Sequence, residues 1–470
     1  MAKKIITIDP ITRIEGHLKV ELEIERGKII DARSSGTLFR GFEIILKGRD
    51  PRDAQQLTQR ACGICSASHA TAASLTLESA FRVRPPSNAR IIRNLVTGAN
   101  FLQSHILHFY LLAALDYFAG PEKPPFIPRF KGDFRLSKQM NKDYLDHYLK
   151  AMEVRRKIHD MIAIFAGKMP HHVSFVPGGV TEKPTVDKIT SFLWRLRESI
   201  DFIENIYVPD VLRIADIYKD YSKIGRGCGN LLSYGAFDLD DRGRKKLFKR
   251  GCFTDGKIEK MNSRKITEDV RYSWYEKKIS GKNPRDSDTL PAPGKAGAYS
   301  WLKAPRYAGK PYELGPLARM WVNGDYRKGI SVMDRHIARA LETKKIARAM
   351  EEWVLQLRPG RRVYVSCRVP KNGQGIGLTE APRGALGHWI KISNSRIARY
   401  QIVTPTNWNC SPRDDKGEPG PVENSLIGTP VADPENPIEV MRIIRSYDPC
   451  MACSVHLIAP GRSIFEFRIC

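Results

Sequence analysis

Cysteine is scarce in this sequence, and so are the features that mark export, membrane insertion or modular construction. Nine cysteines among 470 residues are too few for a disulfide scaffold, and their odd number leaves at least one unpaired. The apolar run at residues 5–8 is too short for a secretory signal, so we expect none on this chain. No Ser/Gly linker, low-complexity tract or internal repeat divides the sequence, which favours one packed unit with insertions.

Long uncharged stretches are rare as well. Residues 94–115 lack Lys, Arg, Asp and Glu over a length that could span a bilayer. Asn94, Gln103, His105 and His108 interrupt this stretch, and polar side chains are costly in lipid. We therefore predict a helix buried inside the protein rather than a transmembrane helix.

Acidic residues are outnumbered by basic ones, 51 to 77, which gives a net charge of +26. Such a charge attracts nucleic acid, anionic lipid or an acidic partner. No helix-turn-helix, RRM or zinc-finger pattern accompanies it, and the charge is spread along the chain with a denser stretch at about 241–288. We expect solvated basic faces, and no nucleic acid among the partners.

The hydrophobic periodicity predicts an α+β fold with a mainly helical core and small peripheral β-sheets. Alternation over residues 20–25, a turn at Gly27 and the apolar pair at 29–30 indicate an N-terminal β-hairpin. Four long segments have helical apolar spacing and should form the core: 86–118, 147–166, 185–218 and 331–357.

The remaining segments predict shorter elements. Gly, Pro, Lys and Arg are frequent over 237–316, which indicates short strands and loops on the surface. Near the C-terminus we expect a strand at 362–366 and a helix at 438–446.

Four of the cysteines form two Cys-x-x-Cys pairs, Cys62/Cys65 and Cys450/Cys453, at opposite ends of the chain. Thiolates are soft donors that select nickel, zinc, copper(I) or iron. Zinc ribbons bring their two pairs from nearby sequence, whereas these pairs would bury a metal centre between N- and C-terminal motifs. On spacing alone, a closed zinc site and a redox-metal site are equal alternatives.

The residues around these pairs separate the alternatives. Arg-Ala-Cys-Gly-Ile-Cys at 60–65 and Asp-Pro-Cys-Met-Ala-Cys at 448–453, followed by His69 and His456 respectively, resemble the paired signatures of nickel-iron hydrogenase large subunits. Further matching motifs lie along the whole chain, at 13–18, 37–53, 108–110 and 380–384. The related subunit of respiratory complex I lacks these metal-binding cysteines, so their presence favours a hydrogenase.

The resemblance implies the catalytic subunit of an enzyme that splits molecular hydrogen heterolytically and reversibly into protons and electrons. It implies a nickel ion bound by Cys62, Cys65, Cys450 and Cys453. Cys65 and Cys453 would also bridge to an iron that carries carbon monoxide and cyanide, and Cys62 and Cys450 would be terminal nickel ligands.

The resemblance also implies roles for neighbouring residues. Glu15 would accept the proton from Cys450, whereas its pattern alone is that of a surface strand residue. Pro382 and Arg383 would face the diatomic ligands of the iron, and Asp448 would hold the arginine in place. Without the resemblance, Arg383 and Asp448 would be an ordinary surface pair.

Two further residues would contact the centre: Thr406 would donate a hydrogen bond to a cyanide, and His69 would bond to a bridging sulfur. Otherwise they would be a turn hydroxyl and a core histidine. The sequence departs from one branch of the family at Ser104, where an aspartate can also contact the arginine. This departure puts the full arginine network in doubt.

A magnesium-like divalent ion is the second cofactor that the resemblance implies. Glu43, the backbone carbonyl of Ile402 and the imidazole of His456 would bind it. Taken alone, Glu43 is typical of a carboxylate at a helix start.

Electron transfer requires a partner, because the other five cysteines are scattered: Cys228, Cys252, Cys367, Cys410 and Cys470. The family supplies an iron-sulfur small subunit whose twin-arginine signal exports the folded pair, with a possible membrane cytochrome behind it. We therefore expect the periplasm or the outer face of the cytoplasmic membrane, with the cytoplasm as runner-up. A non-catalytic zinc-stabilised protein and a basic nucleic-acid-binding module are the rival functions.

The C-terminus carries the first testable prediction. The resemblance implies that residues 1–456 are the catalytic domain and that a dedicated protease removes residues 457–470 after nickel-insertion factors have acted. A physical reason is that the tail would otherwise have to thread through the packed interior beside the metal. The alternation at 463–469 would also allow a permanent strand. Intact-mass measurement of active protein should show a chain ending at His456; a chain that keeps Cys470 would contradict removal.

Overall fold

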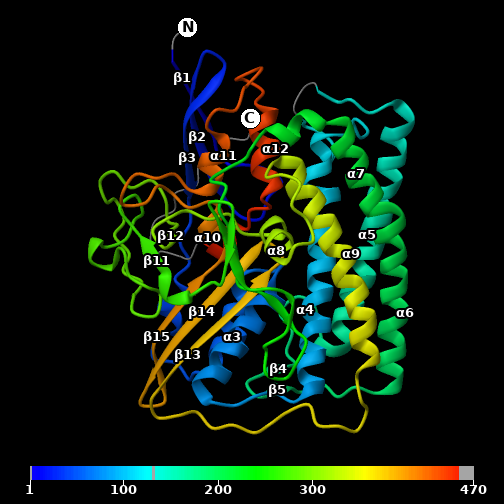
Figure 1. Cartoon of the computed structure of the whole chain (residues 1–470), viewed down its shortest axis with the longest axis vertical. Helices are drawn as coiled ribbons and strands as arrows, with labels where there is room; N and C mark the ends of the chain where they lie inside the picture. The colour runs from blue at the N-terminus through cyan, green and yellow to red at the C-terminus, as the bar shows by residue number, and fades with distance from the viewer. Residues whose placement is uncertain (1–2, 130–132, 455–470) are drawn as a thin grey trace.

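The computed structural model describes residues 3–129 and 133–454, except the side chains of Cys453 and Ser454. Its architecture is α+β, as predicted. Figure 1 shows long helices standing side by side at the right of the molecule, with the sheets and the irregular segments at the left. The long helices are α4 (Ser87–Leu107), α5 (Lys138–Ala166), α6 (Val186–Phe202), α7 (Val208–Ile217) and α9 (Val332–Leu355).

These helices confirm the four predicted core segments, with changes at their ends. The hydroxyl groups of Ser137, Thr185 and Ser331 accept backbone N–H bonds at the starts of α5, α6 and α9, as capping residues do. Helix α5 begins nine residues before the predicted start at 147, because its first turns are polar and bury little apolar surface.

Helix α4 occupies the centre of this bundle and includes most of the uncharged stretch at 94–115. Every residue from Ile91 to Leu107 is buried, and the chain continues as a π-helix at His108–Ala113. Within the described part of the chain, no helix is long and apolar enough to cross a membrane. The prediction of a protein-buried helix is confirmed.

The N-terminal hairpin is also confirmed, within a larger sheet. Strands β1 (Lys4–Ile8), β2 (Leu18–Glu25) and β3 (Lys28–Gly36) pair in that order and are antiparallel. Alternate residues of β2, from Leu18 to Ile24, point into the core.

A second antiparallel sheet was not predicted. It consists of β13 (Gly373–Ala381), β14 (Gly384–Ser393) and β15 (Arg396–Val403), and helix α3 (Ser66–Phe81) packs on it. The approach is close: a Cβ at Gly377 would lie 2.3 Å from the carbonyl oxygen of Ala72. Glycine is depleted in strands, and α3 is rich in Ala and Ser, so neither element has a strong sequence signal.

The predicted strand at 362–366 is wrong. Tyr364 forms only an isolated bridge with Gly179, because the strand that contains Gly179, β5 (Gly179–Val180), is too short to pair along the whole segment. The helix predicted at 438–446 is confirmed as α12 (Ile438–Ser446), and the predicted short strands between 237 and 316 are present.

The remaining elements are short. The strands are β4 (Phe175–Val176), β5 (Gly179–Val180), β6 (Leu231–Ser233), β7 (Ala236–Asp238), β8 (Lys246–Phe248), β9 (Gly251–Thr254), β10 (Lys257–Glu259), β11 (Ile266–Asp269) and β12 (Ala304–Tyr307). The helices are α1 (Phe42–Leu46), α2 (Asp53–Thr58), α8 (Pro316–Asn323), α10 (Pro405–Asn409), α11 (Pro421–Leu426) and α13 (Met451–Ser454).

Candidate metal centre

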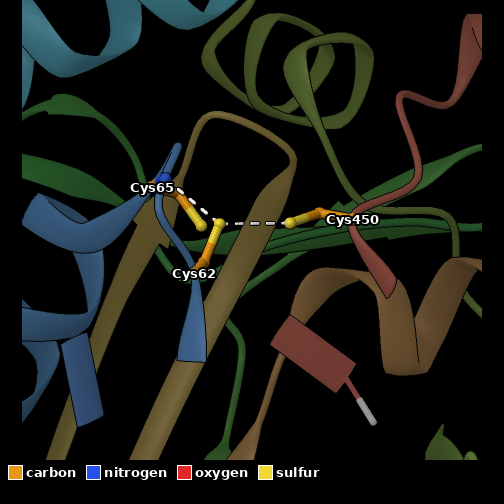
Figure 2. Close-up of side chains that lie close together, drawn as sticks. All are labelled: Cys62, Cys65 and Cys450. Atoms are coloured by element: carbon orange, nitrogen blue, oxygen red, sulfur yellow. Dashed lines mark hydrogen bonds between the residues drawn. The ribbon is translucent and has the colours of Figure 1, made fainter. Parts of the chain in front are cut away.

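Three of the four predicted cysteine ligands meet in the interior. Cys62 follows a 3-10 helix, Cys65 precedes α3, and Cys450 precedes α13. Their sulfur atoms all lie within 4.8 Å of one another, and all three residues are buried. Figure 2 shows Cys62 and Cys65 from one segment facing Cys450 from another, with 3.3 Å between the Sγ atoms of Cys62 and Cys450.

The backbone around Cys62 supports an anionic sulfur. The N–H groups of Ile64 and Cys65 donate to its Sγ atom, each at 3.3 Å. The loop itself is held from α4, because the amides of Asn100 and Gln103 donate to the carbonyl of Ile64 at 2.7 and 3.0 Å. The loop geometry is therefore set by the helical core.

This donor set fits a soft metal. The three thiols are free of disulfides although they are buried side by side, and buried thiolates need a compensating cation. Cys453 lies in α13, but its side chain is outside the described residues, as is His456. The ligand role of all four cysteines therefore stays a prediction, and the structure brings three of them together.

The N-terminal Glu15 segment joins the C-terminal motif through its backbone. The carbonyl of Glu15 accepts the N–H of Met451 at 2.7 Å, and its own N–H donates to Pro449 at 3.3 Å. Gly16 has φ +80°, and a Cβ there would lie 2.8 Å from the backbone nitrogen of Ala452. Glycine is needed at this position both for the conformation and for the close approach.

Arg40 ties the two cysteine motifs together. Its Nη1 atom donates to the carbonyl of Ala61 at 2.8 Å and to that of Ala452 at 3.1 Å. One guanidinium group thus spans the segments before Cys62 and after Cys450. This contact was not predicted, although Arg40 lies inside a motif that the resemblance covers.

The side-chain carboxyl group of Glu15 contacts the thiol of Cys450. Its Oε2 atom accepts a hydrogen bond from the thiol of Cys450 at 3.0 Å and another from the N–H of Ala452 at 3.0 Å. Burial, assisted by the charge of Cys62, raises the pKa of Glu15 above its usual value, while these hydrogen bonds lower it. The structure thus places the carboxyl group against Cys450 rather than on the surface.

Arg383 and Asp448 form a buried ion pair, not a surface pair. The Nη2 atom of Arg383 donates to Oδ1 of Asp448 at 2.9 Å. Burial raises the pKa of Asp448 to about 6, although Arg383 opposes this shift. Arg383 also donates from Nη1 to the hydroxyl of Ser104, at a long distance of 3.4 Å. Serine at position 104, where one branch of the family has aspartate, thus still forms a weak hydrogen bond with the arginine.

Thr406 and His69 also lie at the centre. The Oγ1 atom of Thr406 accepts the backbone N–H of Cys450 at 3.1 Å. His69 is buried, and burial lowers its pKa to about 4, so its imidazole is neutral at pH 7. Its Nδ1 atom lies 3.3 Å from Nε2 of His388, a partner that the sequence did not predict.

Two of the three predicted ligands of the divalent ion are close together. The Oε1 atom of Glu43 accepts the backbone N–H of Ile402 at 2.8 Å, and Thr289 donates to Oε2. Glu43 lies in the first turn of α1, as a helix-start carboxylate does.

Arg319 on α8 is a neighbour that sequence reasoning missed. It is fully buried and donates to the carbonyls of Ala381 at 3.0 Å and Pro382 at 2.8 Å, directly before Arg383. Glu342 and Glu380 accept from the same guanidinium group. An arginine in an ordinary amphipathic helix gives no sequence signal for such a contact.

The fold and the site define an α+β metalloprotein with a buried thiolate centre built from both ends of the chain. A family model described as nickel-dependent hydrogenase matches residues 40–123, 118–329 and 324–456, and a HoxL-like model matches residues 5–35. The chain belongs to the nickel-dependent hydrogenase family, and it is an oxidoreductase of the hydrogenase class.

Known relatives cover the chain almost completely. It is 45% identical to the periplasmic [NiFeSe] hydrogenase large subunit of Desulfomicrobium baculatum, over 96% of this chain and 95% of that protein. It is 33% identical to the quinone-reactive Ni/Fe-hydrogenase large chain of Wolinella succinogenes, over 100% and 98%.

The structural comparison agrees. The reduced Ni-Fe-Se hydrogenase of Desulfovibrio vulgaris Hildenborough superposes with a TM-score of 0.95 at 49% identity, over 97% of this chain and 100% of that chain. Cysteine stands at all four motif positions here, so the selenium in these names is not carried over to this chain.

The contacts of Arg319 give a second prediction. Arg319→Lys should keep a positive charge beside Glu342 but lose the planar fork that binds two carbonyls at once. A displaced Arg383 should lower hydrogen turnover by roughly 10- to 100-fold, because small misplacements at a reacting centre are costly.

Metal analysis and hydrogen-uptake assays of the purified enzyme check this outcome. Arg327→Lys is the control, since Arg327 is exposed and donates to the carbonyl of Trp321, away from Arg383. Full activity in the Arg319 variant, or loss of the metals along with activity, would show that Arg319 does not act through Arg383.

Proposed function

We propose that Cys62, Cys65, Cys450 and Cys453 bind a nickel-iron centre at which this subunit cleaves hydrogen heterolytically and reversibly. Cys65 and Cys453 would bridge to the iron, whose other ligands would be carbon monoxide and cyanide. The observation that carries the proposal is the meeting of three buried thiols from opposite ends of the chain, with a carboxyl group on one of them. Neither the zinc alternative nor the nucleic-acid alternative is favoured by any comparison.

The chain's own residues would handle the proton and orient the site. When bound, the metal centre supplies the two-electron chemistry of hydrogen cleavage. Glu15 receives the proton from the Cys450 thiol along the 3.0 Å contact, and its raised pKa lets it hold that proton. Arg383 presents a fixed positive charge beside the cysteines, and its pair with Asp448 sets the direction of the guanidinium group.

Three other side chains complete the proposed site. Thr406 would donate its hydroxyl proton to a cyanide while its oxygen accepts from the backbone of Cys450. His69 would donate to a bridging sulfur, for which its neutral imidazole is suited. Pro382 would line the diatomic ligands without a polar group of its own.

We also propose a divalent ion, magnesium or a similar metal, bound by Glu43, the carbonyl of Ile402 and His456. Support comes from the hydrogen bond that the Ile402 N–H donates to Glu43, which brings the carboxylate close to the backbone of Ile402. Carboxylate and carbonyl oxygens are the ligands that such cations prefer. His456 lies outside the described residues.

The electrons would leave through an obligate iron-sulfur small subunit. Large-subunit relatives imply such a partner, and Cys62, Cys65 and Cys450 form the one cysteine cluster in the described part of the chain. The periplasmic and quinone-reactive relatives support a site at the outer face of the cytoplasmic membrane, with a possible cytochrome partner. We propose residues 1–456 as one catalytic unit, with 457–470 removed by the maturation protease.

The metal content provides the third prediction. Purified enzyme should contain nickel and iron in equal amounts, with infrared bands of bound carbon monoxide and cyanide. Cys62→Ser should abolish hydrogen turnover, because the hydroxyl is a harder and less acidic ligand than the thiol. Cys228→Ser is the control, because Cys228 is a half-buried cysteine outside the cluster. The Cys228→Ser enzyme should retain hydrogen turnover.

Two results would contradict this centre. Zinc without nickel in the purified protein, together with an absence of hydrogen turnover, would support the zinc alternative. Ordinary turnover in fully metal-loaded Cys62→Ser protein would remove Cys62 from the ligand set.

The Glu15 contact gives the fourth prediction. Glu15→Gln should keep both metals but slow hydrogen-deuterium exchange by roughly 100-fold or more, since an amide cannot accept the proton. Glu21→Gln, a change on the half-buried face of β2, should leave exchange unchanged. Unaltered exchange in the Glu15 variant would assign the proton to another group.

A further inference from the structure

A polar cavity lies at the edge of the β13–β15 sheet, away from the cysteines. We call it the sheet-edge pocket; it has a volume of about 310 Å³ and is lined by Arg264, Arg285, Ile376, Trp389, Lys391 and Arg399. Ile376 lies five residues before the end of β13, a distance of roughly 17 Å along the strand. Nothing in the proposed hydrogen chemistry uses this pocket.

The pocket carries an uncompensated positive charge. Four of its lining residues are cations and no lining residue is acidic; Arg399 lies 3.9 Å from Asp286, whose side chain is 72% exposed. Among the residues that the structure describes, Arg264, Arg285 and Lys391 form no ion pair. Basic residues outnumber acidic ones by 77 to 51 in this chain, so unpaired surface cations are common in it; what distinguishes these four is that they line one cavity together.

Two of the arginines are held in place before any ligand arrives. Gln374 accepts hydrogen bonds from Nε and Nη2 of Arg285 at 3.1 and 2.6 Å. Arg399 donates to the backbone carbonyl of Arg285 at 2.5 Å. A positioned guanidinium group loses less freedom on binding than a free side chain.

The loop that carries Arg285 is fixed as well. The amide of Asn283 donates to the carbonyls of Ser263 and Ile266, at 2.9 and 2.7 Å. These bonds fasten the Arg285 loop to the neighbouring loop that carries Arg264. Arg285 and Arg399 therefore lie on a hydrogen-bonded framework at the cavity.

The sheet supplies an apolar floor. Ile376 on β13 is directly opposite Trp389 on β14 in the strand register. Gly375 and Gly377 face α3, so Ile376 and Trp389 point to the other side of the sheet. Ile376 is 36% exposed there, which leaves apolar surface inside a ring of cations.

We infer that the sheet-edge pocket binds a small organic molecule that carries a diphosphate or a similar multiply charged oxyanion group. Guanidinium groups bind such oxygens through paired hydrogen bonds, and the Ile376–Trp389 floor contacts the apolar part of the ligand. The volume suits a small ligand, since ligand cavities begin at about 300 Å³.

Calorimetric titration of the purified enzyme with ADP, pyrophosphate and adenosine tests the inference. ADP should bind saturably and more tightly than pyrophosphate at about 0.15 M salt, where long-range attraction is screened, and adenosine should bind least. Arg264→Gln and Lys391→Gln should each weaken ADP binding by roughly 10-fold, the value expected for one charge-assisted hydrogen bond.

Both variants should keep hydrogenase activity, which shows that they fold. Arg156→Gln is the matched control, because Arg156 is an exposed cation on α5 outside the pocket, and it should bind ADP as the parent does. Absence of saturable binding to either phosphate, equal loss in the control, or no loss in the pocket variants would overturn the inference. Tighter binding of a tetra-glutamate peptide than of ADP would also overturn it, in favour of an acidic protein segment.

Discussion

The backbone contact between Glu15 and the segment around Cys450 is the constraint on which the rest of this structure depends. It joins residues near the two ends of the chain, and the same residue provides both the backbone bonds and the carboxyl group on the Cys450 thiol. Because Cys62, Cys65 and Cys450 come from both ends of the chain, the helices and sheets between them must be in place for the three sulfur atoms to meet. This dependence explains why so much buried polar structure surrounds the contact.

Arginines near both partners of the Glu15–Cys450 contact bond to a shared buried aspartate. Arg445, just before the C-terminal motif, donates to both oxygens of Asp116 and to the carbonyl of Thr12, and Arg13 also bonds to Asp116. Removing one partner from such a buried pair costs about 3–5 kcal/mol, because the other charge is left unpaired. Because losing any one of these charged groups would be costly, the network holds the segments of Arg13 and Arg445 in a fixed arrangement.

A second support runs from the sheet to the same centre. Helix α3 starts directly after Cys65 and packs on β13, whose glycines allow the helix backbone to approach. Strand β13 ends at Ala381, and Arg319 donates a hydrogen bond to the carbonyl of Pro382, the residue before Arg383. One packed unit thus sets the positions of Cys65 and of Arg383, and the proposed metal centre requires such precision.

The sequence alone determined the elements with strong periodicity and the residues that carry distinctive chemistry. The N-terminal hairpin, the long helices and the two cysteine pairs were predictable because apolar spacing and thiol spacing are local patterns. Only the tertiary structure decided which neighbours those residues have. Strand β13 is rich in glycine, which has a low strand propensity, and α3 is buried on almost all sides, so that it lacks a helical apolar pattern despite its alanines; their mutual packing defines both elements. The segment at 362–366 has only the two-residue strand β5 as a partner, despite its strand-like pattern. The positions of Arg40, Arg319 and His388 depend on contacts between residues far apart in the chain, and no local pattern encodes such contacts.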